Sequence, residues 1–191
     1  MNLTGQLLIA MPAMTDPVFS KTVTLICTHN QDGAIGVVLN RPMQLSVTSL
    51  FSQIQLAEPP TEYLQALVHF GGPVQGDRGF VLHSTGTEYN STIIVNPHIA
   101  LTTSKDILEA MAQNQAPQKV LIALGYAGWT AGQLEAEMAQ NAWLSVQTNL
   151  DSTNLNFTDL VFDMPHTEKF ERAMAMMGLN YANLADTAGH A

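Results

Sequence analysis

Short apolar segments, either alternating with polar residues or continuous, dominate the first half of the chain. Residues 22–29 are rich in β-branched side chains and alternate, which is typical of a half-buried strand. The Asp32-Gly33 pair that follows is a strong hairpin signal, so residues 34–40 are predicted to return as the next strand. The same criteria predict further strands at residues 7–10, 67–70, 79–83, 92–95, 99–102, 120–124, 143–148 and 160–162.

Apolar residues spaced by three and four predict helices, mainly in the second half. The clearest spans residues 167–177, with Phe170, Ala173 and Met174 on one face and Gly178 as its stop. Other helices are predicted at 46–53, at 104–114 with Ser104 as cap, and from Thr130 to about residue 141.

The stretch from residue 120 to 137 is the predicted functional surface. It reads as a buried strand, an elbow containing Gly125 and Gly128, and a helix that Thr130 caps. Trp129 is then a pocket wall, or part of a packed corner that holds the strand to the helix.

Strands joined by turns, followed by mixed helices and strands, predict an α+β fold with mostly antiparallel pairing. A chain of 191 residues fits one domain. We expect this domain to span residues 1–179 and residues 180–191, which lack periodicity, to form a frayed tail.

The charge balance argues against two classes of partner. The chain has 16 acidic and 7 basic residues, a net charge of −9, and the basic residues are scattered. Binding to nucleic acid or to an anionic membrane surface relies on clustered lysine and arginine, so neither is expected. No apolar run has the length of a membrane span, and no charged segment precedes the apolar start as in a signal peptide.

The familiar catalytic and cofactor motifs are missing from the sequence. The glycines at 125, 128 and 132 lack the spacing of a dinucleotide-binding loop and the Lys-Ser/Thr of a phosphate-binding loop. There is no Gly-x-Ser-x-Gly elbow and no histidine pattern of a zinc site. We therefore expect no cofactor, no metal and no recognised catalytic set.

The single cysteine, Cys27, cannot form an internal disulfide, which fits a reducing, cytoplasmic setting. Cys27 and His29 are two residues apart on a predicted strand, so they are expected to face the same side. A thiolate–imidazole pair is one interpretation. A buried small side chain beside a hydrogen-bonded histidine is the favoured one.

Two arginines beside turns are candidates for anion binding. Arg41 follows Asn40 at a strand end, and Arg78 follows the turn formed by Gly71, Gly72 and Pro73. The planar guanidinium suits carboxylate or phosphate. The alternative is that each arginine pairs with an acidic neighbour and holds its own loop. Two glutamates of the next helix, at 135 and 137, are expected to point to different sides.

Several segments, in order along nearly the whole chain, resemble the AlgH/YqgE family of small bacterial proteins. They are residues 7–12, 16–19, 27–30, 33–42, 71–74, 79–84, 125–135 and 141–143, together with the final helix. Thr28, where the family often carries an acidic residue, and Phe170, where it often carries tryptophan, depart from the pattern. The resemblance implies a bacterial cytosolic α+β domain, with a split sheet curled toward a barrel and helices outside.

The resemblance implies little chemistry, since the family's label as a transcriptional regulator is a genetic association. The leading hypothesis is a non-enzymatic regulatory or binding protein, a monomer or weak homodimer, that acts through a protein partner or small ligand. The alternative is an enzyme or sensor that binds a small anion. The residues expected to line that pocket are Asn40, Arg41, Gly71, Gly72, Pro73, Arg78, Gly125, Gly128, Trp129, Gln133 and Glu135.

Overall fold

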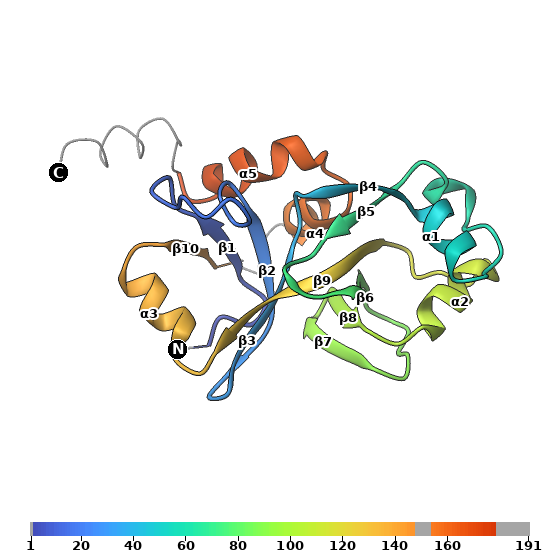
Figure 1. The fold of residues 1–191 in the computed structure, drawn as a ribbon, viewed down its shortest axis with the longest axis horizontal. Coiled ribbons are helices and arrows are strands. Elements are labelled where there is room, and N and C mark those ends of the chain that lie inside the picture. Colours follow the sequence, from blue (N-terminus) through green and yellow to red (C-terminus); the bar gives the residue numbers. More distant parts are fainter. Residues whose placement is uncertain (1, 148–153, 179–191) are drawn as a thin grey trace.

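A long strand, β9 (Val120–Thr130), crosses the middle of the molecule and joins its two halves (Figure 1). The structure is a computed structural model that describes residues 2–147 and 154–178. Within these residues β9 pairs antiparallel with β3 (Gly33–Val38) and β6 (Val74–Ser84) and parallel with β5 (Leu67–Phe70).

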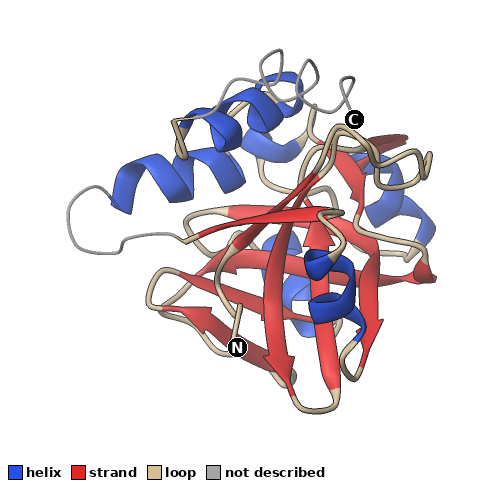
Figure 2. Ribbon diagram, turned by 90° about the vertical axis from the view of Figure 1, so that its left-hand side faces the viewer, coloured by secondary structure: helices blue, strands red, loops and turns tan. Residues whose placement is uncertain are grey.

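The remaining strands extend the sheet on both sides of β9. Their hydrogen-bonded order is β10-β1-β2-β3-β9-β6-β8-β7, and β4 is attached through β5. These strands are β1 (Leu7–Ala10), β2 (Val23–Asn30), β4 (Pro42–Ser46), β7 (Thr92–Asn96), β8 (Ile99–Thr102) and β10 (Trp143–Val146). The sheet is strongly curled without closing (Figure 2). The predicted α+β fold with a mostly antiparallel, split and curled sheet is confirmed.

Five helices pack around this sheet in the described part of the chain. They are α1 (Val47–Gln53), α2 (Asp106–Ala112), α3 (Gln133–Ala139), α4 (Asn154–Phe162) and α5 (His166–Ala175), with a single 3₁₀ turn at Thr61–Tyr63. Helices α4 and α5 lie together over one side of the sheet (Figure 2). None of the helices in the described residues is both long and apolar enough to span a membrane.

Three apolar clusters form the core of the described part of the chain, one beneath each group of helices. The largest contains buried side chains of β1, β2, α4 and α5, among them Leu7, Leu25, Leu160 and Met174. A second lies under α1 and α2, and the third surrounds Trp129 and Trp143 beside α3. Burial of these apolar surfaces is the main stabilising contribution to the fold.

The predicted elbow after residue 124 is wrong, because β9 continues to Thr130. Gly125 adopts φ +73° within the strand, and residues beyond it pair with β3 and β6. Helix α3 begins only after Gly132, whose φ is +74° and which caps it without a side-chain hydrogen bond. Thr130 is therefore a strand end and not a helix cap. Pairing on both edges keeps this glycine-rich segment extended.

The predicted strand at residues 160–162 is also wrong, because these residues belong to α4. Short apolar runs do not distinguish a strand from a buried helix by periodicity. Here Phe157, Leu160 and Val161, spaced as on one helical face, are all buried in the largest cluster. The frayed tail predicted at 180–191 lies outside the described residues.

Candidate functional site

Asn40 and Arg41 hold the loop that precedes β2. The side chain of Asn40 accepts a hydrogen bond from Val23 N at 2.9 Å and donates one to Lys21 O at 2.9 Å. Arg41 Nη2 donates to Ser20 O at 2.5 Å. Both residues line a hollow of about 670 Å³ beside the start of α5. Among the described carboxylates none forms an ion pair with Arg41, so its loop is held through a backbone carbonyl.

Arg78 lies elsewhere, exposed on β6. Its guanidinium donates to Gln75 Oε1 at 3.4 Å and to Thr103 Oγ1 at 3.3 Å, and it lies 6.0 Å from the centre of the Phe80 ring. Arg78 is not among the residues that line the hollow beside Arg41. The two arginines do not converge there on one anion.

The glycines predicted for the pocket lie where two backbone segments cross at close distance. A Cβ on Gly71 would lie 2.2 Å from Gly125 O, and one on Gly72 would lie 2.0 Å from Tyr126 C. Both glycines are buried, while Pro73 beside them is exposed. These positions bring the segment before β6 against β9 and leave no room for a ligand between them.

The corner around Trp129 is a packed hydrogen-bond cluster. The indole nitrogens of Trp129 and Trp143 both donate to Glu137 Oε2, at 2.9 and 2.7 Å. Gln133 accepts from Thr130 N at 3.0 Å and donates to Glu137 Oε1 at 2.8 Å. The two tryptophan rings meet edge to face, with centroids 5.8 Å apart. These contacts fit the interpretation of Trp129 as part of a packed corner.

Trp129 and Gly128 also line a shallow hollow of about 430 Å³ with Tyr126 and Asp32. No residue lines both this hollow and the one beside Arg41. The predicted residues are thus divided among two hollows, a backbone crossing, an exposed strand and the start of α3. Ligand binding by any of them stays a prediction.

A β-bulge separates Cys27 from His29. The register of β2 against β3 shifts between Ile26 and Thr28, which places an extra residue in the strand. Cys27 then points into the largest core cluster, and burial raises the pKa of its thiol to about 12. The expectation that the two side chains face the same side is therefore wrong, and so is the thiolate–imidazole pair.

His29 instead links Leu3 to helix α3 through hydrogen bonds. Its Nδ1 accepts a hydrogen bond from Leu3 N at 3.1 Å, so the proton of the neutral ring lies on Nε2. Nε2 lies 3.0 Å from Glu135 Oε1 and donates to it. The pKa of Glu135 is lowered, first by its own backbone N–H at the start of α3 and then also by His29. Glu135 and Glu137 point to different partners, as the sequence predicts.

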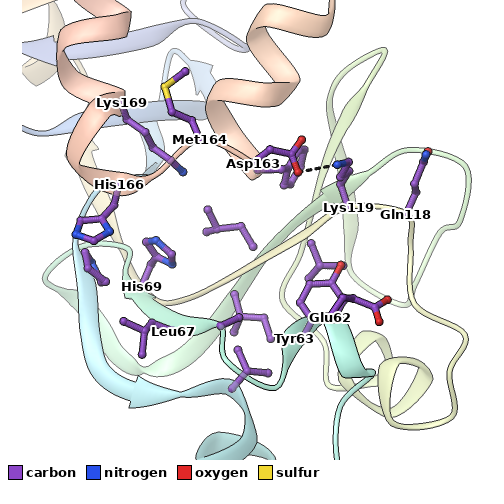
Figure 3. Close-up of a pocket in the computed structure, with 17 residues that line it drawn as sticks. Glu62, Tyr63, Leu67, His69, Gln118, Lys119, Asp163, Met164, His166 and Lys169 are labelled. Carbon is purple, nitrogen blue, oxygen red and sulfur yellow. Dashed lines mark hydrogen bonds and ion pairs between the residues drawn. The ribbon is translucent and has the colours of Figure 1, made fainter.

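A pocket absent from the sequence prediction lies between β5, β9 and the turn from α4 to α5. Its volume is about 460 Å³. At one end His69 of β5 faces His166 and Lys169 of α5, and this end is called the inner end (Figure 3). At the other, the outer end, Lys119 and Asp163 form an ion pair at 2.6 Å (Figure 3).

Lys169 supplies an ammonium group at the inner end. The residue is only 2% exposed, and Nζ donates a hydrogen bond to Val161 O at 2.7 Å near the end of α4. Burial lowers the pKa of Lys169 to about 8, and the charge of Asp163 partly opposes that shift. The group is therefore mostly protonated at pH 7, and it has no carboxylate ion-pair partner among the described residues.

His69 supplies a partly buried imidazole beside it. Its Nδ1 is inaccessible to solvent and has no hydrogen-bond partner within the described chain. Burial, followed by the charges of Lys169 and His166, lowers the pKa of His69 to about 4. The ring is neutral at pH 7, so one of its nitrogens is a donor and the other an acceptor. An unpaired buried nitrogen costs free energy that a bound polar group would recover.

Two signals in the sequence could have indicated this pocket. Lys169 lies four residues before Ala173, so it falls on the apolar face of the last helix, where lysine is unusual. His166 lies three residues before Lys169, on the same side of the first turn. No local pattern links either residue to His69, since β5 reaches them only through tertiary packing. Within the described residues no group of three His, Cys, Asp or Glu side chains could hold a metal ion.

Comparison with known proteins identifies relatives along the whole chain. A family model described as AlgH-like matches residues 7–182. A UPF0301 protein of Thiobacillus denitrificans is 49% identical over all of this chain and 98% of its own length, and one of Azoarcus sp. is 47% identical over all of this chain and 97% of its own.

Solved structures agree with this relationship. The solution structure of the AlgH protein from Pseudomonas aeruginosa matches with a TM-score of 0.78 and 44% identity, covering all of this chain and 97% of that one. A crystal structure of protein DIP2367 from Corynebacterium diphtheriae matches with a TM-score of 0.70 over 96% of this chain and 91% of that one, and at 16% identity it shows the fold alone. The family expected from the sequence motifs is confirmed: this chain belongs to the AlgH-like family.

Proposed function

We propose that this chain is a non-enzymatic binding protein that takes a small anionic ligand at the inner end of the pocket formed by His69, His166 and Lys169. The observation that carries the proposal is the buried Lys169 ammonium, which no described carboxylate neutralises. A buried charge without a counter-charge is costly, and an anion that reaches it would relieve that cost. One ammonium proton is used by Val161 O, which leaves others for a ligand.

Binding, and not catalysis, is proposed because of the groups that reach the pocket. The ammonium of Lys169 and the imidazoles of His69 and His166 hold and orient an anion, while the strongest nucleophile of the chain, Cys27, is buried in the core with a raised pKa. A regulatory role, which the family's label suggests, would then act through the ligand or a protein partner. Direct operator binding is not proposed, because the net charge is −9. A cytoplasmic location fits the single unpaired cysteine.

The test measures binding of acetate and inorganic phosphate by NMR titration of the wild type and of Lys169→Met. Methionine keeps the length of the buried stem and removes the charge, so the variant is expected to fold. We expect millimolar binding to the wild type and at least about tenfold weaker binding to Lys169→Met, since a charge-assisted hydrogen bond is lost. Lys105→Met, an exposed lysine paired with Glu109, is the matched control. Equal binding to wild type and Lys169→Met would contradict the proposal.

A second candidate site is the hollow that Asn40 and Arg41 line. The observation in its favour is that, within the described residues, Arg41 forms one hydrogen bond, to a backbone carbonyl, and no ion pair with a carboxylate. Arg41→Gln keeps a donor for Ser20 O and removes the charge. A loss of anion-induced thermal stabilisation in Arg41→Gln, with none in Lys169→Met, would move the site from the inner end to this hollow.

A further inference from the structure

We infer that the ligand of this pocket is a monocarboxylate with an apolar body, an inference that rests on the proposed function and specifies its ligand class. Between its two polar ends the pocket is lined mainly by apolar side chains. Val47 and Ile122 are buried in the pocket wall, and Tyr63, Leu67 and Met164 are partly or largely accessible there. In Figure 3 Leu67 and Tyr63 lie along one side, and Met164 lies above them.

The exposure of Leu67 supports an apolar occupant. Leu67 is 43% exposed, one of few large apolar side chains with such exposure in the described residues, and it lines the pocket. Exposed apolar surface inside a concave site is typical of ligand pockets, which combine apolar walls with a few polar groups that fix orientation. The volume of about 460 Å³ lies within the range of small-molecule sites.

The charges limit the ligand to one negative group. At the inner end a single ammonium, Lys169, faces a neutral imidazole, His69, so one negative charge is balanced. At the outer end the ion pair already uses Lys119, and Glu62 adds a further carboxylate to the lining (Figure 3). A second negative group placed there would be repelled. A phosphate ester with two charges therefore fits less well than a carboxylate whose other end is apolar.

The carboxylate would be held by contacts that the inner end leaves unused. Lys169 Nζ has protons beyond the one donated to Val161 O, and His69 Nδ1 has no partner. Nδ1 is closed to solvent, so the His69 ring would have to turn toward the ligand; with its proton on Nδ1 it then donates to the second carboxylate oxygen. Neither contact would displace an ion pair of the described chain, because neither group forms one.

The experiment compares acetate, hexanoate, hexanamide and inorganic phosphate by calorimetric titration of the full chain. We expect hexanoate to bind about tenfold or more tightly than acetate, because added methylene groups become buried. Hexanamide, which lacks the charge, is expected to bind at least about tenfold more weakly than hexanoate. Leu67→Asp should weaken the binding of hexanoate, while the affinity for acetate should stay within about twofold of that of the wild type.

The matched control is Ile94→Asp, because Ile94 is 51% exposed on β7 and does not line the pocket. Hexanoate affinity should be unchanged by it. If acetate and phosphate bind as tightly as hexanoate, and Lys169→Met loses all three, the ligand class is wrong and the proposed function stands. If no anion binds the wild type, or if Lys169→Met binds hexanoate as well as the wild type does, both proposals fail.

Discussion

At the scale of single residues, the contacts that matter most are made with distant parts of the chain. Lys169 is buried and His69 is partly buried at the inner end of the pocket, although their elements lie about a hundred positions apart, and the pKa of each is lowered, which favours its neutral form. Glu137 joins two indoles through one carboxylate. In each case the sequence shows the residue type, while the partner is supplied by tertiary packing.

The pKa of His69 predicts a loss of stability in mild acid. In the unfolded chain His69 takes up a proton as the pH falls through about 6.5, but in the folded state it does so only near pH 4. Protons therefore favour unfolding in this window. The contribution of neutral His69 to the free energy of unfolding is fully present above about pH 6.5. It decreases toward pH 4, by at most about 3 kcal/mol.

Urea unfolding of the wild type and of His69→Gln at several pH values measures this effect. The variant lacks the titrating group, so its free energy of unfolding should fall less between pH 6.5 and 4 than that of the wild type. Parallel pH profiles would contradict the prediction. Other groups that titrate in this range act in both proteins and cancel in the comparison.

Removal of the Glu137 carboxylate is predicted to destabilise the corner. Glu137→Ala leaves the indole N–H groups of Trp129 and Trp143 without their acceptor, and both rings are buried. We expect a loss of about 2–4 kcal/mol in the free energy of unfolding. Glu137→Gln keeps one acceptor oxygen and should lose clearly less, whereas an equal loss in the two variants would show that the shared acceptor is unimportant.

At the scale of elements, most strands were predictable, whereas β4, the helical state of residues 160–162 and the path of β9 were not. Alternating β-branched segments such as residues 22–29 identify strands because half-buried strands need that pattern. The glycines of β9 look like a turn in isolation. They lie in a strand because Gly71 and Gly72 cross Gly125 and Tyr126 at backbone contact distance, a requirement that no single segment reveals.

The candidate site, too, could be predicted from the sequence only in part. The sequence indicated arginines and glycines next to turns, since those residue types often hold ligands. It could not show that Asn40 and Arg41 face α5 while Trp129 faces Glu137, because these directions depend on the strand order. The bulge at Cys27 likewise arises from pairing with β3 and changes which residues of β2 share a face.

The backbone crossing at Gly72 is predicted to tolerate no side chain. A Cβ there would overlap the backbone of Tyr126 and Ala127, at 2.0–2.2 Å. Gly72→Ala should destabilise the fold by about 3 kcal/mol or more, or prevent recovery of folded protein, since main chain must move. Gly76→Ala is the matched control, because nothing lies within 4 Å of its Cβ. Thermal unfolding of both variants checks this, and similar melting temperatures would contradict it.

At the scale of the whole molecule, an acidic chain contains one pocket end that is positive. The net charge of −9 and the low share of charged residues leave few lysines and arginines, yet Lys169 is buried where its charge is costly. A monomer or weak homodimer remains our expectation, since the site proposed here is complete within one chain.

Strand β9 has a consequence for how the molecule opens. It is hydrogen-bonded to β3 on one side of the fold and to β5 and β6 on the other, so neither half can separate while β9 keeps its partners. Its central amides should therefore exchange with solvent deuterium only through global unfolding, at a rate set by the full free energy of unfolding. Amides of β7, which pairs only with β8 among the described strands, should exchange earlier. Hydrogen exchange followed by mass spectrometry would reveal two separately unfolding halves if β9 exchanged in two steps, and a single cooperative unit if it exchanged in one.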